Sequence, residues 1–220
     1  MKYKAGLVWL FAVLLSVFVL AGCGESGKKA SEDKDTASQS TENAGDRTDG
    51  TEELLSGKHH ARIVIKDYGT LEVELDADVA PISVTNFVKL AKSGFYDGLT
   101  FHRIIDGFMM QGGDPKGDGT GGSEETIKGE FSENGVENPI SHVRGVISMA
   151  RAQAMDSASS QFFIVQTDSL YLDGKYAAFG TVTDGMEIVD EICQKAVPID
   201  SNGLIDPAEQ PVIEMIKILD

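Results

Sequence analysis

The stretch at residues 101–122, FHRIIDGFMMQGGDPKGDGTGG, restricts the possible fold more than any other part of this 220-residue chain. Two short apolar segments flank Asp106-Gly107, and Asp-Gly is a preferred sequence for a tight hairpin turn. Side chains alternate along a strand, so Met109 and Gln111 share one face, and Arg103 points away from its two neighbours. The stretch therefore predicts a groove with one fixed cation beside apolar surface and an amide, with no nucleophile nearby.

Three blocks of the sequence follow one another in the order of a known family. The run F-H-R-I-I-x-G-F-M-x-Q-G-G-D at residues 101–114 resembles the signature of the cyclophilin family of peptidyl-prolyl isomerases. Residues 146–164 contain a run that resembles the next cyclophilin block, and residues 172–180 resemble the one after it. Because three blocks occur in family order, the resemblance is specific.

The periodicity of the remaining chain predicts many strands and two helices. Alternating residues at 61–66 and 70–76 indicate a hairpin around Asp67-Tyr68-Gly69, and Pro81 opens a helix that Gly94 ends. Later elements are expected as strands at 146–149, 160–166, 177–183 and 212–219 and as a helix at 185–195. Such a pattern favours a barrel or a sandwich. The resemblance implies a mainly β protein, the closed eight-stranded antiparallel cyclophilin barrel with a helix over each end.

The N-terminal part of the chain is expected to lie outside this domain, which spans residues 57–220. Two lysines precede an apolar run that ends Leu-Ala-Gly-Cys, so residues 1–22 resemble a bacterial lipoprotein signal peptide that leaves Cys23 as the lipidated N-terminus. An uncleaved transmembrane helix is the alternative. Residues 23–56 are polar and predict a disordered tether. Both alternatives place the domain outside the cytoplasm, anchored to a bacterial cell membrane.

Charge and cysteine content exclude several classes of function. The chain has 19 Lys and Arg against 35 Asp and Glu, and residues 57–220 hold 13 and 26 of these, a formal charge of −13 out of −16. Such an acidic domain is not expected to bind nucleic acid or an anionic lipid surface. With Cys23 lipidated, Cys193 has no disulfide partner. Its place on the apolar stripe of the second helix predicts a core residue.

The activity that the resemblance implies is rotation about an X–Pro peptide bond. The uncatalysed barrier is about 18–20 kcal/mol. No bond is broken, so no nucleophile, metal or other cofactor is expected. A donor aimed at the imide nitrogen favours the twisted state over the planar one. Arg103 suits this role because guanidinium is a rigid, permanently charged fork of donors. The alternative is an arginine that merely pairs with a carboxylate.

The other site residues are implied by the resemblance. It assigns catalytic roles to Phe108 and Gln111 beside Arg103. The substrate-binding set that it implies consists of Met109, Ala150, Arg151, Ala152, Gln161, Phe163, Tyr171, Leu172 and Tyr176. Within that set the apolar side chains are expected to form a proline pocket, Gln161 to help orient the arginine, and the main chain at 150–152 to pair with an extended peptide.

Two positions depart from the family pattern. Tyr171 stands where a rim tryptophan is common, and Tyr176 stands where a pocket histidine is common. Tyrosine still supplies a flat apolar wall and a hydroxyl, so proline binding is expected to persist. Binding of cyclosporin-type drugs is expected to be weak. Arg151 replaces a frequent asparagine, a change that main-chain pairing tolerates.

Three further motifs suggest other functions less strongly. Residues 114–125 place acidic side chains at several positions of a calcium loop, but Lys116 stands where a ligand oxygen belongs. The glycines of that loop lack the Gly-Lys-Ser/Thr ending of a phosphate loop. The pair His59-His60, at the boundary with the tether, has no partners at metal spacing and is interpreted as solvated.

The sequence therefore predicts a peptidyl-prolyl isomerase that acts outside the cytoplasm on exported, incompletely folded chains containing proline. The alternative is a cyclophilin-fold chaperone or scaffold that holds such segments with little turnover. Arg103 together with Phe108, Gln111 and Phe163 favours the enzyme, because a pure binder does not need the arginine. A calcium-dependent adhesin built on the acidic loop is a third and weaker hypothesis.

Overall fold

The computed structural model describes residues 53–220. The predicted signal peptide, the lipidation site Cys23 and most of the predicted tether lie outside these residues. Contacts with the folded domain begin at Leu55, whose N–H donates to Thr85 Oγ1 (2.9 Å) and whose side chain packs on the core. The domain thus includes residues just before the expected boundary at 57. Within the described range, no helix is long and apolar enough to span a membrane.

Eight strands and two α-helices make up the described domain, with two single-turn 3-10 helices at Ser132–Asn134 and Leu170–Leu172. The strands are β1 (Lys58–Ile65), β2 (Gly69–Asp76), β3 (Arg103–Ile105), β4 (Met109–Gly112), β5 (Val146–Met149), β6 (Phe162–Val165), β7 (Ala178–Asp184) and β8 (Ile213–Ile218). The helices are α1 (Pro81–Lys92) and α2 (Met186–Lys195). The expected mainly β fold with two helices is confirmed.

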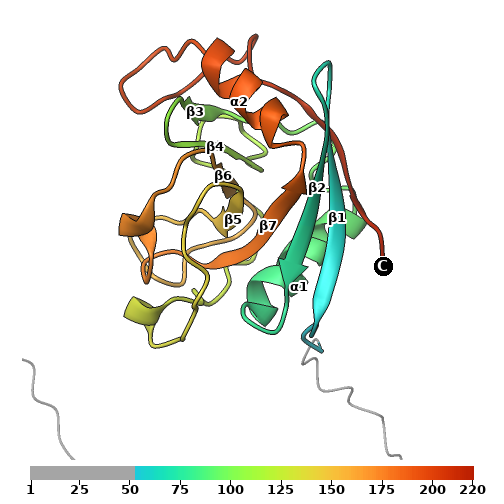
Figure 1. Cartoon of the computed structure of the whole chain (residues 1–220), viewed down its shortest axis with the longest axis vertical. Helices are drawn as coiled ribbons and strands as arrows, with labels where there is room; N and C mark the ends of the chain where they lie inside the picture. The colour runs from blue at the N-terminus through green and yellow to red at the C-terminus, as the bar shows by residue number, and fades with distance from the viewer. Residues whose placement is uncertain (1–52) are drawn as a thin grey trace, which may run out of the picture. The chain divides into compact units, whose positions relative to one another are not determined.

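All eight strands form one antiparallel sheet in the order β3-β4-β6-β5-β7-β2-β1-β8. The sheet is curled, as Figure 1 shows. The closed barrel is not confirmed, because within residues 53–220 the edge strands β3 and β8 do not pair with each other. The chain before β3 contacts β8 and the segment before it: Thr100 and Val212 form an isolated bridge, Phe101 N–H donates to Pro211 O (2.9 Å), and Ile213 N–H donates to Leu99 O (2.8 Å).

Two details of the expected elements were wrong. The strand expected from Phe101 is shortened to Arg103–Ile105, because the main chain of Phe101 and His102 bonds to Pro211 and Ile205 instead of continuing the ladder with β4. The first strand begins at Lys58 and not at the expected residue 61, so the histidine pair beside the tether boundary lies inside β1. His60 is exposed, whereas His59 is half-buried and its ring lies 3.5 Å from the Asp220 carboxylate.

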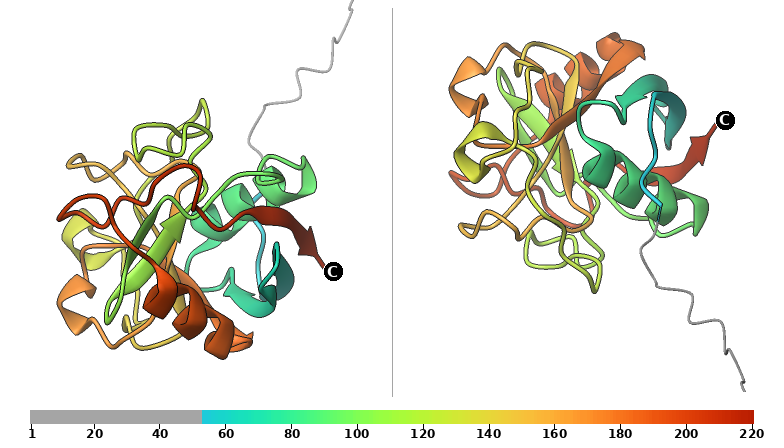
Figure 2. Two further views of the ribbon diagram at one scale, coloured as in Figure 1. Left: turned by 90° about the horizontal axis from the view of Figure 1, so that it is seen from above. Right: turned by 90° about the horizontal axis from the view of Figure 1, so that it is seen from below.

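The core fills the space between the curled sheet and the helices. Figure 1 places α2 near one end of the sheet and α1 towards the other, and Figure 2 shows the strands curving around the interior. Phe87 of α1 packs edge-on against Phe162 of β6 at a ring distance of 5.5 Å. Cys193 is buried, as expected, and burial raises the pKa of its thiol to about 12. It is a core residue rather than a reactive thiol.

Candidate active site

The pairing of three strands brings the predicted catalytic residues together. Arg103 of β3 lies opposite Gln111 of β4, and Gln111 lies opposite Phe163 of β6. Residues directly opposite one another share a face of the sheet, so these three side chains line one surface. Their neighbours His102 and Ile104 are buried on the interior side. The short hairpin turn between β3 and β4 contains Gly107 at φ 79°, a left-handed conformation that glycine adopts without strain.

The guanidinium of Arg103 is held from two directions. Its Nε donates to the main-chain oxygen of Asn202 (2.7 Å), and its Nη1 donates to Gln111 Oε1 (3.1 Å) and lies 3.6 Å from Met109 Sδ. Among the described residues no carboxylate pairs with it and none accepts from Nη2. Burial lowers the pKa of Arg103, and the nearby Tyr176 and Asp200 oppose that shift. The side chain is therefore a fixed cation with one free edge.

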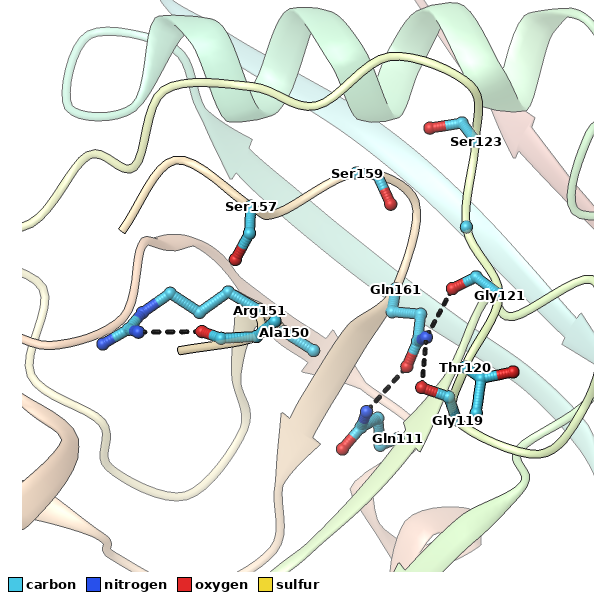
Figure 3. A pocket seen from close by; sticks show the side chains of 12 residues that line it. Gln111, Gly119, Thr120, Gly121, Ser123, Ala150, Arg151, Ser157, Ser159 and Gln161 are labelled. Carbon is cyan, nitrogen blue, oxygen red and sulfur yellow. Dashed lines mark hydrogen bonds between the residues drawn. The ribbon is translucent and has the colours of Figure 1, made fainter. Parts of the chain in front are cut away.

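A relay of amides holds Gln111 in turn. Gln111 Nε2 donates to Gln161 Oε1 (2.8 Å), and Gln161 Nε2 donates to the main-chain oxygens of Gly121 (2.7 Å) and Gly119 (3.2 Å). Figure 3 shows this chain of contacts crossing from β4 to the loop at residues 119–121. The relay fixes which end of the Gln111 amide faces Arg103, because its nitrogen is already engaged. Its oxygen is left to accept from the guanidinium.

One side of this surface is an apolar cavity of about 340 Å³. Arg103 stands at its edge, and it is also lined by Phe108, Met109, Phe163, Tyr171, Leu172 and Tyr176. The rings of Phe163 and Tyr176 meet edge to face at 5.8 Å and 88°. Tyr171 is 62% exposed and forms the outer rim beside Phe108, with ring centres 5.9 Å apart. The cavity has the flat apolar walls that a pyrrolidine ring requires.

The other side is a polar cavity, also of about 340 Å³, shown in Figure 3. It is lined by Gly119, Thr120, Gly121, Gly122, Ser123, Ala152, Ser157, Ser159 and Gln161. Gln111, Ala150 and Arg151 line both cavities and form the wall between them. The structure thus brings all the predicted site residues of the described chain to one continuous groove. Their individual roles stay predictions.

Arg151 is fixed more firmly than its sequence position suggested. Its guanidinium lies between two rings, 4.9 Å from the centre of Phe131 and 4.8 Å from that of Tyr176. Its Nε donates to Lys175 O (2.9 Å). Sequence reasoning assigned only the main chain of this residue to the site. The side chain additionally braces Tyr176, one wall of the apolar cavity.

A buried histidine supports the apolar cavity from behind. His142 stacks on Phe163 at 6.0 Å and 14°, and its two ring nitrogens lie 2.9 Å from Asp173 Oδ1 and 3.0 Å from Ser148 Oγ. Burial lowers the pKa of His142, and Asp173 opposes that shift. Ser148 is 0% exposed, so this Ser-His-Asp arrangement has no access to a substrate. It is a support for Phe163 and not a nucleophilic centre.

The acidic loop that resembles a calcium site is organised by its own main chain. The buried carboxylate of Asp114 accepts from the N–H groups of Lys116 (2.8 Å), Asp118 (3.2 Å) and Gly119 (2.6 Å). These bonds use the oxygens that a cation would need. In residues 53–220 no group of three or more His, Cys, Asp and Glu side chains is placed to hold a metal ion.

Sequence reasoning missed the turn that supplies the second contact of Arg103. Asn202 lies in the run Asp200-Ser201-Asn202-Gly203, far from the recognised blocks. Asp, Ser, Asn and Gly are typical turn formers, so a tight turn was recognisable there. Its contact with Arg103 was not, because 99 positions separate the two residues in the chain.

The fold and the groove define a class: β-sheet proteins with a groove in which a fixed arginine lies beside an apolar cavity. The family model for cyclophilin type peptidyl-prolyl cis-trans isomerases matches residues 60–219. The chain therefore belongs to the cyclophilin family, and the expected enzyme class, peptidyl-prolyl cis-trans isomerase, is confirmed.

Individual relatives agree with this assignment. The chain is 49% identical over 124 residues to peptidyl-prolyl cis-trans isomerase B of Bacillus subtilis, which covers 56% of this chain and 83% of the relative. It is 43% identical over 158 residues to peptidyl-prolyl cis-trans isomerase A of Dickeya dadantii, and this alignment covers 69% of this chain and 80% of the relative. A Cryptosporidium parvum cyclophilin structure determined in the presence of the dipeptide Ala-Pro matches with a TM-score of 0.64 and 31% identity, over 73% of this chain and 99% of the other.

Proposed function

We propose that this isomerase acts outside the cytoplasm, where it is held to a bacterial membrane by lipid on Cys23 and turns over X–Pro bonds in exported, incompletely folded polypeptides. The catalytic part of the proposal rests on Arg103. Its guanidinium lines the apolar cavity and is fixed through Nε and Nη1, which leaves the Nη2 donors free. The Leu-Ala-Gly-Cys sequence carries the cellular part.

In the proposed mechanism the proline ring occupies the apolar cavity, and the chain on the other side of the imide bond runs past Gln111 towards the polar cavity. The N–H groups of Arg151 and Ala152 donate to no described residue and are available to an extended peptide. Arg103 Nη2 then donates to the imide nitrogen as it becomes pyramidal. This interaction exists only in the twisted state, so it lowers the barrier to rotation without strengthening the binding of the planar ground state.

The catalytic part is tested with a protease-free assay of cis/trans exchange in a short X–Pro peptide. We expect the full chain to accelerate the exchange, which takes tens to hundreds of seconds without catalyst at 25 °C. Binding of the peptide with exchange at the uncatalysed rate would instead support the chaperone or scaffold function.

The cellular part is tested with Cys23→Ser. We expect this variant to leave the membrane fraction or to accumulate as an unprocessed precursor, because two acyl chains or more are needed for a stable anchor. Isomerase activity of the purified variant serves as the control and should be unchanged. Unaltered processing and membrane retention would favour the transmembrane alternative.

A further inference from the structure

The turn at residues 200–204, between α2 and β8, is hydrogen-bonded to the main chain of β3 around Arg103. Arg103 and Leu204 form an antiparallel bridge, Ile104 N–H donates to Gly203 O (2.8 Å), and Ile205 N–H donates to His102 O (2.9 Å). Figure 1 shows the chain that follows α2 passing beside β3. The turn thus acts as a short additional strand on the free edge of β3, and Arg103 is at the centre of the contact.

The same turn also holds the side chain of Arg103. The carbonyl of Asn202 accepts from Arg103 Nε at 2.7 Å, on the opposite side of the guanidinium from Gln111. Two acceptors on different elements define the orientation of a planar group, whereas one would leave it free to rotate. The direction of the free Nη2 edge therefore depends on where the Asn202 carbonyl points.

Asp200 closes the turn that contains this carbonyl. Its Oδ1 accepts from the N–H groups of both Asn202 and Leu204, each at 2.9 Å, and so closes the turn from within. Gly203 has φ 90°, and a Cβ there would lie 2.5 Å from Ile105 Cγ1 and 2.9 Å from Ile104 O. Only glycine allows the turn to approach β3 this closely.

We infer that Asp200 is a positioning residue for catalysis, which acts through the Asn202 carbonyl to aim the guanidinium of Arg103. The inference rests on the proposed catalytic role of Arg103 and adds to it a second support from outside the recognised family blocks. Asp200 itself is outside both cavities, so it affects the transition state without touching the substrate.

The test compares Asp200→Ala with Asp206→Ala in the full chain, purified in detergent, with kcat and KM measured in the protease-free assay. Asp206 is a matched control because its Oδ1 also closes a neighbouring turn, accepting from Ala208 N–H (3.0 Å), without reaching Arg103. We expect Asp200→Ala to lower kcat about tenfold with KM nearly unchanged, since a misaligned group loses rate more than binding. Asp206→Ala should keep wild-type values.

Two further variants separate positioning from folding. Asp200→Asn keeps an oxygen that accepts the same two N–H groups, so we expect it to restore most of the lost kcat. Gly203→Ala pushes the turn away from β3 and should lower kcat even with Asp200 intact. If Asp200→Ala unfolds the protein, the comparison of Gly203→Ala with wild type still decides the matter, and normal kcat in that variant would overturn the inference.

The decisive measurement is kcat of the double variant, Asp200→Ala with Arg103→Ala, compared with kcat of Arg103→Ala alone. A residue that acts only through Arg103 adds no further loss once the arginine is gone. An equal loss of kcat in both backgrounds, or wild-type kcat in Asp200→Ala alone, would show that the turn does not aim the guanidinium. If instead Arg103→Ala retains full activity, the proposed catalytic role of Arg103 is wrong. This outcome is distinguishable from a failure of the positioning role of Asp200, in which Arg103→Ala loses activity and Asp200→Ala does not.

Discussion

The apolar and polar cavities are equal in volume and share a wall, yet their construction differs. The apolar cavity is made mostly of rings and a thioether from β4 and the turn before it, β6, and residues 171–176, and packing and ring contacts hold its side chains. The polar cavity is made of glycines and hydroxyls from two loops, and hydrogen bonds hold its main chain. Arg103 lines the apolar cavity and not the polar one, and its Nη2 has no acceptor among the described residues.

This difference indicates a division of labour. A rotation about an X–Pro bond needs an apolar seat for the ring and one donor for the nitrogen, and the apolar cavity supplies both. The polar cavity offers hydroxyl groups and main-chain oxygens, which suit the neighbouring residues of a peptide of variable sequence. Its second contribution is indirect, because the Gln161 amide that lines it orients Gln111 and, through Gln111, Arg103.

Removing the arginine side chain from the apolar cavity should have the largest effect on turnover. Arg103→Ala is expected to lose roughly 10²–10³ of turnover, the typical loss for one preorganised donor, while the fold survives because no core cavity opens. The measurement is kcat/KM for a short X–Pro peptide, with circular dichroism as the check on folding. Arg62→Ala is the control, since Arg62 lies on β1 and pairs with Glu72 away from the groove. More than half of wild-type turnover in Arg103→Ala would contradict the assignment.

The rim of the apolar cavity should decide drug binding. Cyclosporin-type ligands are expected to bind weakly, because Tyr171 replaces a tryptophan whose N–H would meet a ligand carbonyl. An acceptor left unpaired costs about 1–3 kcal/mol, or about tenfold to a hundredfold in affinity. Tyr171→Trp should recover that factor. The chain's one tryptophan, Trp9, lies in the predicted signal peptide, so the new indole would be the only one in the mature protein and also a fluorescence reporter. Low nanomolar binding by the wild type would exclude this explanation.

The sequence predicted the apolar cavity better than the supports around it. Arg103, Met109 and Gln111 lie within ten positions of one another, and the alternation of a short hairpin is enough to place them on one surface. The strands and helices were also recognisable, because their periodicity is local. The bracing of Tyr176 by Arg151 and of Phe163 by His142 depends on loops that meet only after folding, so no local pattern reveals them.

The closure of the sheet was not predictable for a similar reason. The family resemblance implied a closed barrel, but the edges of the sheet meet mainly through the segments at residues 98–101 and 211–212, which lie outside the named strands. Local periodicity could not separate these segments from the strands beside them. The same irregular chain before β8 contains the turn that reaches Arg103.

The relay between the cavities should have an intermediate effect on turnover. Gln161→Ala frees the Gln111 amide to rotate, and we expect about a tenfold loss in kcat, smaller than for Arg103→Ala because the donor itself remains. Ser157→Ala is the matched control, because Ser157 also lines the polar cavity but bonds only to Ala154 O (2.6 Å). It should change turnover of a short peptide less than about twofold. Equal losses in both variants would show that the polar cavity contributes more than orientation.

The smallest effect on turnover is expected from pH, which should act on stability and not on the groove. No histidine, lysine or carboxylate of the described domain lines either cavity, and arginine stays charged, so kcat/KM should be flat from about pH 6 to 9. The buried histidines behave differently. Burial lowers the pKa of His142 behind Phe163, and burial likewise lowers the pKa of His102, with Asp114 opposing the shift.

The sign of the stability change follows from where protons bind. Both imidazoles stay neutral in the folded state at a pH where histidines of the unfolded chain, with an ordinary pKa of about 6.5, are already charged. The unfolded state therefore binds more protons below about pH 6.5, and stability, complete above that value, falls as the pH decreases, by at most about 1.4 kcal/mol per pH unit for each histidine. Urea unfolding at pH 7.5 and 5.5 measures the fall, and His142→Gln should reduce it. An inflection of kcat/KM near the pKa of histidine, in protein that is still folded, would contradict this expectation. It would mean that protonation of His142 changes the position of Phe163, on which it stacks, and so alters the apolar cavity.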